Sequence, residues 1–141
     1  MKKENTIQPF KNGDIFLGCT YLNDEVDDHK GDGRILQYTK NLEPKGILWT
    51  EGTEHLVIGL TIDPQGVLWG FDMHNHIVVR VSPDGKQMPN HDFGDRAFSN
   101  ATFDKEGNIY LGECLVGNTP FPGSFMKRFS GSRSSRLCKY S

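Results

Sequence analysis

No stretch of the sequence is apolar over the roughly 20 residues that a membrane-spanning helix needs. The first ten residues carry lysines without an apolar core behind them, which is unlike a secretory signal. The formal net charge of −2 gives no basic field that would attract nucleic acid. The three cysteines include no Cys-x-x-Cys pair and provide no disulfide framework. We therefore expect a cytoplasmic protein with reduced thiols that binds neither membranes nor nucleic acid.

The sequence has instead a dense pattern of short strands and tight turns between residues 59 and 93. β-Branched and aromatic residues favour strands at 60–62, 67–71 and 77–82, with a weaker strand near 87–93. Asp63–Gly66 and Pro83–Lys86 favour turns, because proline fixes φ and glycine tolerates positive φ. Four short antiparallel strands joined by tight turns are typical of one blade of a β-propeller.

This unit recurs on both sides of the central stretch. The second strands of the three units are Gly13–Gly18, Gly66–Phe71 and Gly107–Gly112. The third strands are Arg34–Thr39, Ile77–Ser82 and Arg136–Ser141. The second strands of the second and third units begin 41 residues apart, at Gly66 and Gly107, a spacing found in propeller blades. The repeat predicts an all-β fold, a β-propeller fragment of about three four-stranded antiparallel blades.

We place the blades at about 5–52, 55–97 and 98–141, with the last one incomplete and Thr6 and Ile7 in the first strand of the first. Three blades do not close a ring, because a propeller needs about four to eight. The simplest interpretation is that the chain is the N-terminal part of a longer protein with six blades. The alternative is a half-propeller that completes a ring by dimerisation.

The chain by itself leaves blade faces open at the ends of the array, and we expect it to self-associate through them. Candidates for this apolar surface are Trp49, Trp69, Phe71 and Tyr110.

The connections between second and third strands are long in the first and third units. In a propeller these connections emerge around the mouth of the central channel, whereas the tight turns emerge on the opposite face. Binding residues are often carried by loops on a rigid scaffold. We therefore expect the functional site at the mouth.

Polar residues that can carry chemistry gather at this predicted mouth. Asp72 and His74 lie in the short connection of the second unit, Asn100 leads the first strand of the third unit, and Glu113 ends its second strand. We assign possible catalytic roles to Glu113, His74 and Asp72, and metal binding to Asn100, Glu113 and Asp72. The alternatives are a turn asparagine, a solvated strand-end glutamate and a turn-capping aspartate.

The segments 59–70 and 77–86 resemble NHL repeats and the senescence-marker-protein/gluconolactonase/streptogramin-lyase superfamily of propellers. In lactonase members a Glu, an Asn and an Asp from different blades hold a divalent cation, which polarises an ester carbonyl and activates water. The Asn100 context resembles that of the family asparagine, with Ala101 in place of the usual glycine. The family Glu and Asp have no clear counterparts.

The sequence thus supports two hypotheses. The first is a metal-assisted hydrolase or lyase of a small cyclic ester or lactone-type substrate, with Ca²⁺, Zn²⁺ or Mg²⁺ at the mouth. The second is a non-catalytic propeller module that binds a protein, peptide or glycan. A tightly bound divalent cation is expected only by the first.

Overall fold

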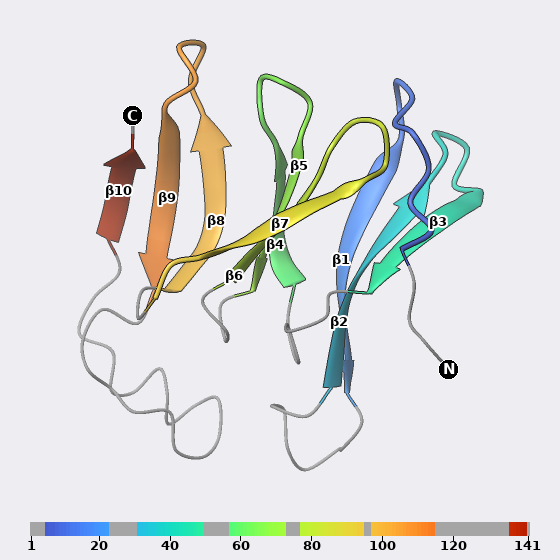
Figure 1. Cartoon of the computed structure of the whole chain (residues 1–141), viewed down its shortest axis with the longest axis horizontal. Coiled ribbons are helices and arrows are strands. Elements are labelled where there is room, and N and C mark those ends of the chain that lie inside the picture. Colours follow the sequence, from blue (N-terminus) through green and yellow to red (C-terminus); the bar gives the residue numbers. More distant parts are fainter. Residues whose placement is uncertain are drawn as a thin grey trace.

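The structure, a computed structural model, describes residues 5–22, 31–49, 57–72, 77–94, 97–114 and 136–140. Every regular element in these ranges is a β-strand, and all strand pairs are antiparallel (Figure 1). The described ranges contain no helix suited to crossing a membrane. The chain is all-β and has the architecture of a β-propeller fragment, as the sequence repeat predicts.

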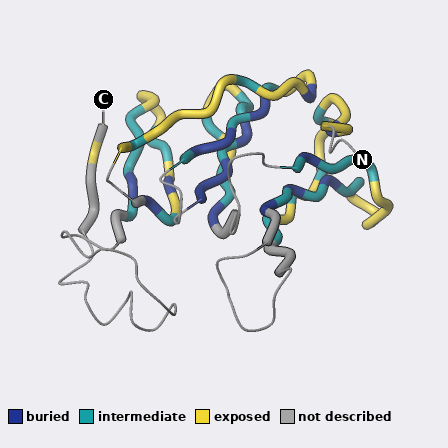
Figure 2. The backbone as a smooth tube through the Cα atoms, turned by 60° about the horizontal axis from the view of Figure 1, so that its bottom comes forward, coloured by how far each residue is buried: buried dark blue, intermediate teal, exposed yellow. Residues whose placement is uncertain are grey.

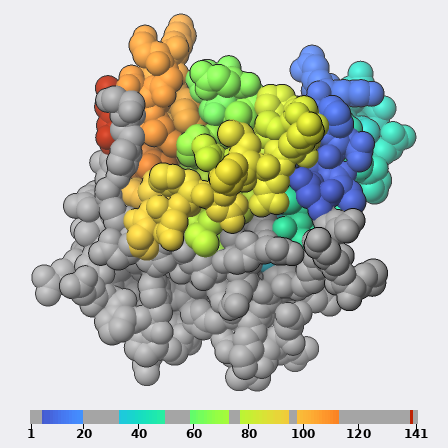
Figure 3. Space-filling view, viewed as in Figure 1, coloured from blue at the N-terminus to red at the C-terminus, as the bar shows by residue number. Residues whose placement is uncertain are grey.

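The strands form three sheets that follow one another along the chain. The first sheet has the order β1 (Ile15–Leu22), β2 (Gly31–Tyr38) and β3 (Pro44–Trp49). The second has the order β4 (Val57–Ile62), β5 (Leu68–Asp72), β6 (Ile77–Val81) and β7 (Gln87–Asp92). The third consists of β8 (Ala97–Phe103), β9 (Ile109–Cys114) and β10 (Arg136–Tyr140), with β9 in the middle. In Figure 3 they appear as adjoining bands with the second sheet between the others.

Aspartates build the tight turns between the first and second strands of the second and third sheets. The Oδ1 atom of Asp63 accepts hydrogen bonds from the backbone N–H groups of Gln65 and Val67, both at 2.9 Å. Gly66 follows with φ at 84°, in the left-handed region that glycine adopts without strain. The second carboxylate oxygen accepts a 2.9 Å hydrogen bond from Nε1 of Trp69 in β5. The turn therefore fixes an aromatic ring on the strand that follows it.

The third unit repeats this arrangement with different residues. Asp104 accepts backbone hydrogen bonds from Glu106 at 3.0 Å and Asn108 at 2.8 Å, and the hydroxyl of Tyr110 donates to its Oδ2 at 3.2 Å. The sequence predicts the turn at Asp63 but not the hydrogen bond between the aspartate and the aromatic side chain.

The second sheet is buried on both faces because successive side chains of a strand point to opposite sides. Leu68, Val79 and Val81 pack toward the first sheet with Ile35 and Leu48. On the other face, Phe71 and Val78 pack with Phe98, Ala101 and Leu111 of the third sheet. Figure 2 shows the buried stretches gathered in the middle of the row, with β7 and the turns exposed.

This packing corrects one prediction. Phe71 is fully buried, and the ring of Trp69 lies 5.5 Å from that of Phe103, so both belong to the contact between the second and third sheets. They are not part of the surface at the ends of the array.

The first strands of the second and third sheets come very close together. A Cβ atom built on Gly59 of β4 would lie 2.0 Å from the carbonyl oxygen of Ser99 in β8. Two backbones can approach to this extent only where one of them has no side chain.

Residues 5–10 do not form the first strand of the first sheet, contrary to the prediction for Thr6 and Ile7. The N–H of Thr6 donates to the carbonyl of Ile47 in β3, and the N–H of Phe10 donates to that of Pro83, both at 2.8 Å. This segment therefore bridges the first and second sheets. Glycines make room for it, because Cβ atoms on Gly46 and Gly85 would lie 2.4 and 2.6 Å from its carbonyl oxygens.

A buried polar cluster holds this segment in place. The carboxylate of Asp14 accepts hydrogen bonds from Lys45, from the backbone of Lys11 and from the side chain of Gln37. Gln37, only 1% exposed, also bonds the backbone N–H and carbonyl groups of Gln8. Burial by itself would raise the pKa of Asp14, but the hydrogen bonds outweigh it and hold that pKa below its ordinary value of 3.8.

This cluster should make folding stability depend on pH in the acid range. Because the folded pKa of Asp14 is lowered, its contribution is complete above the ordinary value and is lost as the pH falls through the folded pKa. We expect Asp14→Asn to lower stability at pH 7 and to flatten the acid limb of a plot of urea midpoint against pH. The exposed Glu43, changed to Gln, is the control. An unchanged acid limb in Asp14→Asn would show that other groups govern it.

Candidate functional site

The second and third strands of each unit meet at one end of their sheet. Leu22 pairs with Gly31, Asp72 with Ile77, and Glu113 with Arg136. We call this the mouth end; it is the lower end of the sheets in Figure 1, opposite the tight turns. The predicted separation of the tight turns from the other connections is therefore present.

Two acidic residues occupy equivalent positions at the mouth end of neighbouring sheets. Asp72 lies six residues after the turn glycine Gly66, and Glu113 lies six residues after Gly107. Each pairs with the strand before it and the strand after it: Asp72 with Val57 and Ile77, Glu113 with Phe98 and Arg136. In the first sheet Cys19 is the equivalent residue, paired with Arg34.

Asp72 is the last residue of β5 and lies inside the sheet, not in the connection where the sequence places it. It is 1% exposed and interacts with other groups of the protein. A buried carboxylate needs such compensation, because its desolvation is otherwise costly. This geometry suits a positioning role for Asp72 better than direct contact with a substrate.

Asn100 does not lead its strand as predicted. It lies in the interior of β8, opposite Gly112, because the strand begins at Ala97 and a bulge between Phe98 and Asn100 shifts the register. Its side chain is exposed, but Oδ1 accepts a 2.8 Å hydrogen bond from the N–H of Ala101. The oxygen proposed as a metal ligand therefore already has a local partner.

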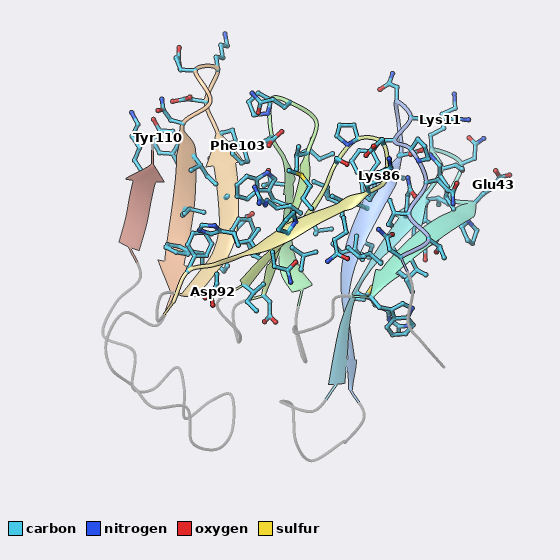
Figure 4. The ribbon with its side chains drawn as sticks, viewed as in Figure 1. Lys11, Glu43, Lys86, Asp92, Phe103 and Tyr110 are labelled. Atoms are coloured by element: carbon cyan, nitrogen blue, oxygen red, sulfur yellow. The ribbon has the colours of Figure 1, made fainter. Side chains whose placement is uncertain are left out.

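The structure adds one acid that the sequence interpretation missed. Asp92 ends β7 and pairs with Ile77, which in turn pairs with Asp72. The two aspartates therefore lie on either side of Ile77, across three neighbouring strands of the second sheet. Figure 4 shows Asp92 at the mouth end, with Phe103 and Tyr110 toward the opposite end of the third sheet. Its carboxylate is exposed and accepts a 2.8 Å hydrogen bond from Gly94. The weak strand signal around 87–93 was the only hint of its place.

Two predicted site residues lie wholly or partly outside what the structure describes. His74 is not described, and for Glu113 only the backbone is. Among the side chains that are described, no three histidine, cysteine or acidic groups gather as a metal site would require.

No protein-family profile and no curated protein sequence matches the chain. A solved structure of a luciferin-regenerating enzyme is similar to it with a TM-score of 0.41 and 14% sequence identity. The match covers 73% of this chain and 36% of that structure, so the chain spans about a third of its length. A similarity at this level carries no information on activity. The class of the protein, a β-propeller fragment, stands on its own sheets and repeats.

Proposed function

We propose that the mouth end binds a small molecule and that the protein is a metal-assisted hydrolase or lyase of a cyclic ester or lactone-type substrate. The observation that supports this is the equivalent placement of Asp72 and Glu113 in adjacent sheets. The repeat brings one acid of each of these two sheets to the mouth end, and the carboxylate of Glu113 supplies the kind of oxygen ligand that hard divalent cations prefer. A bound cation would polarise the ester carbonyl and lower the pKa of a bound water.

The roles within this proposal differ among the residues. Glu113 is the proposed metal ligand and base, since it lies at the mouth end of β9, directly before the last residue of that strand. Asp72, buried beneath the same end, is proposed to position its neighbours. Asn100 contributes only if its Oδ1 atom gives up the hydrogen bond from the N–H of Ala101 and binds the cation instead. His74 is proposed as a catalytic residue from the sequence alone.

Calorimetric titration with Ca²⁺, Zn²⁺ and Mg²⁺ tests the proposal. We expect one of these ions to bind, and Glu113→Gln to weaken its affinity at least tenfold because a carboxylate ligand is lost. Glu106→Gln is the matched control: it removes the same charge from the same sheet at an exposed turn residue. Equal affinities of the two variants would remove Glu113 from the site.

The second candidate is a non-catalytic binding module for a protein, peptide or glycan. It is favoured by the lack of a three-group metal site among the described side chains and by the occupied Oδ1 of Asn100. If titration detects no divalent ion, the hydrolase or lyase proposal fails and the binding module remains.

A further inference from the structure

The outer face of the first sheet, formed by Ile15, Leu17, Leu36 and Tyr38, has the apolar pattern of a covered surface. Ile15 is 41% exposed and Leu17 is 51% exposed. Direct pairing places Ile15 beside Tyr38 and Leu17 beside Leu36. Directly paired residues of an antiparallel sheet share a face.

The second sheet shows what this pattern does when a neighbour is present. There, Leu68 pairs with Val81 and Gly70 with Val79, at the positions equivalent to the two pairs of the first sheet. Leu68 is 1% exposed and both valines are 0% exposed, because the first sheet packs over them. The outer face of the first sheet therefore repeats a surface that is made to receive another sheet.

The outer face of the third sheet, formed by Thr102, Tyr110 and Lys139, repeats the opposite half of such a contact. In register these three residues match Thr61, Trp69 and Arg80 of the second sheet.

The details of the two sets agree. The Lys139 ammonium and the Arg80 guanidinium each lie 5.5 Å from the centre of their aromatic ring. Both rings also donate to a turn aspartate. In the second sheet the third sheet packs on this surface, with Phe103 against Trp69. The outer face of the third sheet is thus a surface on which one more sheet would fit.

We propose that the outer face of the third sheet docks on the outer face of the first sheet of a second copy of this chain. Both halves of the contact are on one chain, and the chain already makes this type of contact twice internally. A two-fold pair makes the new contact twice and places the six described sheets of the two copies in a ring, within the four to eight that propellers use. The contact buries the exposed side chains of Ile15 and Leu17, and this burial stabilises the pair.

The pair would set the mouth ends of both copies around a common channel. A site built from several blades would then draw residues from both chains. The docking does not depend on the proposed activity, and its test does not use it.

Sedimentation of the chain between 1 and 100 μM tests the docking. We expect a folded dimer, and we expect Leu17→Glu to raise its dissociation constant at least tenfold by placing a charge in the contact. Leu42→Glu is the control, because Leu42 is 69% exposed in a turn outside this face, and it should leave the dimer intact. A folded wild-type monomer, or equal effects of the two variants, would overturn the proposal.

Mixing two variants, each altered on a different face, tests whether the third sheet of one copy docks on the first sheet of the other. Thr102→Arg should also yield monomers, because Thr102 is exposed on the other face. A mixture of Leu17→Glu and Thr102→Arg chains retains one contact with both faces intact and should recover dimer. A dimer unaffected by Thr102→Arg would mean that like faces pair, and assemblies larger than two copies would mean that the ring does not close; either result contradicts the proposal.

Discussion

Replacing Gly59 with alanine should destabilise the fold by about 3 kcal/mol or more, at the upper end of the cost of overpacking. The added methyl group would lie 2.0 Å from the Ser99 carbonyl oxygen and 3.0 Å from its carbonyl carbon. Backbone atoms cannot rotate away as a side chain can, so β4 and β8 would have to separate. Urea denaturation followed by circular dichroism measures the change.

Gly112→Ala is the matched control for this substitution. Gly112 is also a strand glycine, but its added Cβ would meet nothing nearer than 3.7 Å. We expect a change within about 1 kcal/mol, on the stabilising side, because alanine restricts the unfolded chain. If both variants have the same midpoint, the close approach at Gly59 does not constrain the fold.

Phe71→Ala should cost about 3–5 kcal/mol, the usual range for removing a buried phenylalanine ring. Phe71 is 0% exposed and is part of the cluster with Val78, Phe98 and Leu111. Since that cluster joins the second and third sheets, the loss should be greatest there. Hydrogen exchange should show reduced protection in β8 and β9 before the first sheet is affected.

The control for Phe71→Ala is Leu42→Ala, which removes apolar atoms from a residue that is 69% exposed. We expect its unfolding free energy to change by no more than about 0.5 kcal/mol. Uniform loss of protection across all three sheets in Phe71→Ala would show that they unfold as a single cooperative unit.

Much of the fold follows from local patterns. The strands 67–71 and 77–82 and the weak strand near 87–93 correspond to β5, β6 and β7, and the predicted turns Asp63–Gly66 and Pro83–Lys86 lie just before β5 and β7. These signals are local, since strand and turn propensities act within a few residues. The path of residues 5–10 was not predictable in this way, because it depends on Gly46 and Gly85 making room in two different sheets.

The candidate site was predicted less well, for a related reason. The sequence places Asp72 and Glu113 at the mouth of a propeller, and the strand register puts both at the same end of their sheets. It does not reveal that Asp72 is buried, or that a bulge moves Asn100 into the interior of β8. Burial and bulges depend on contacts between strands that are distant in sequence, which repeat spacing does not encode.

The missing side chain of Gly59 has a geometric consequence for the contact between the second and third sheets. Sheets packed face to face usually lie about 10 Å apart, yet β4 and β8 almost touch there. The second and third sheets thus come closest where Gly59 meets Ser99, while the rings of Trp69 and Phe103 lie in the same contact, nearer the tight turns. A larger residue at position 59 would push β8 away from β4 at this point, so the spacing of these two sheets depends on a single hydrogen atom in place of a side chain.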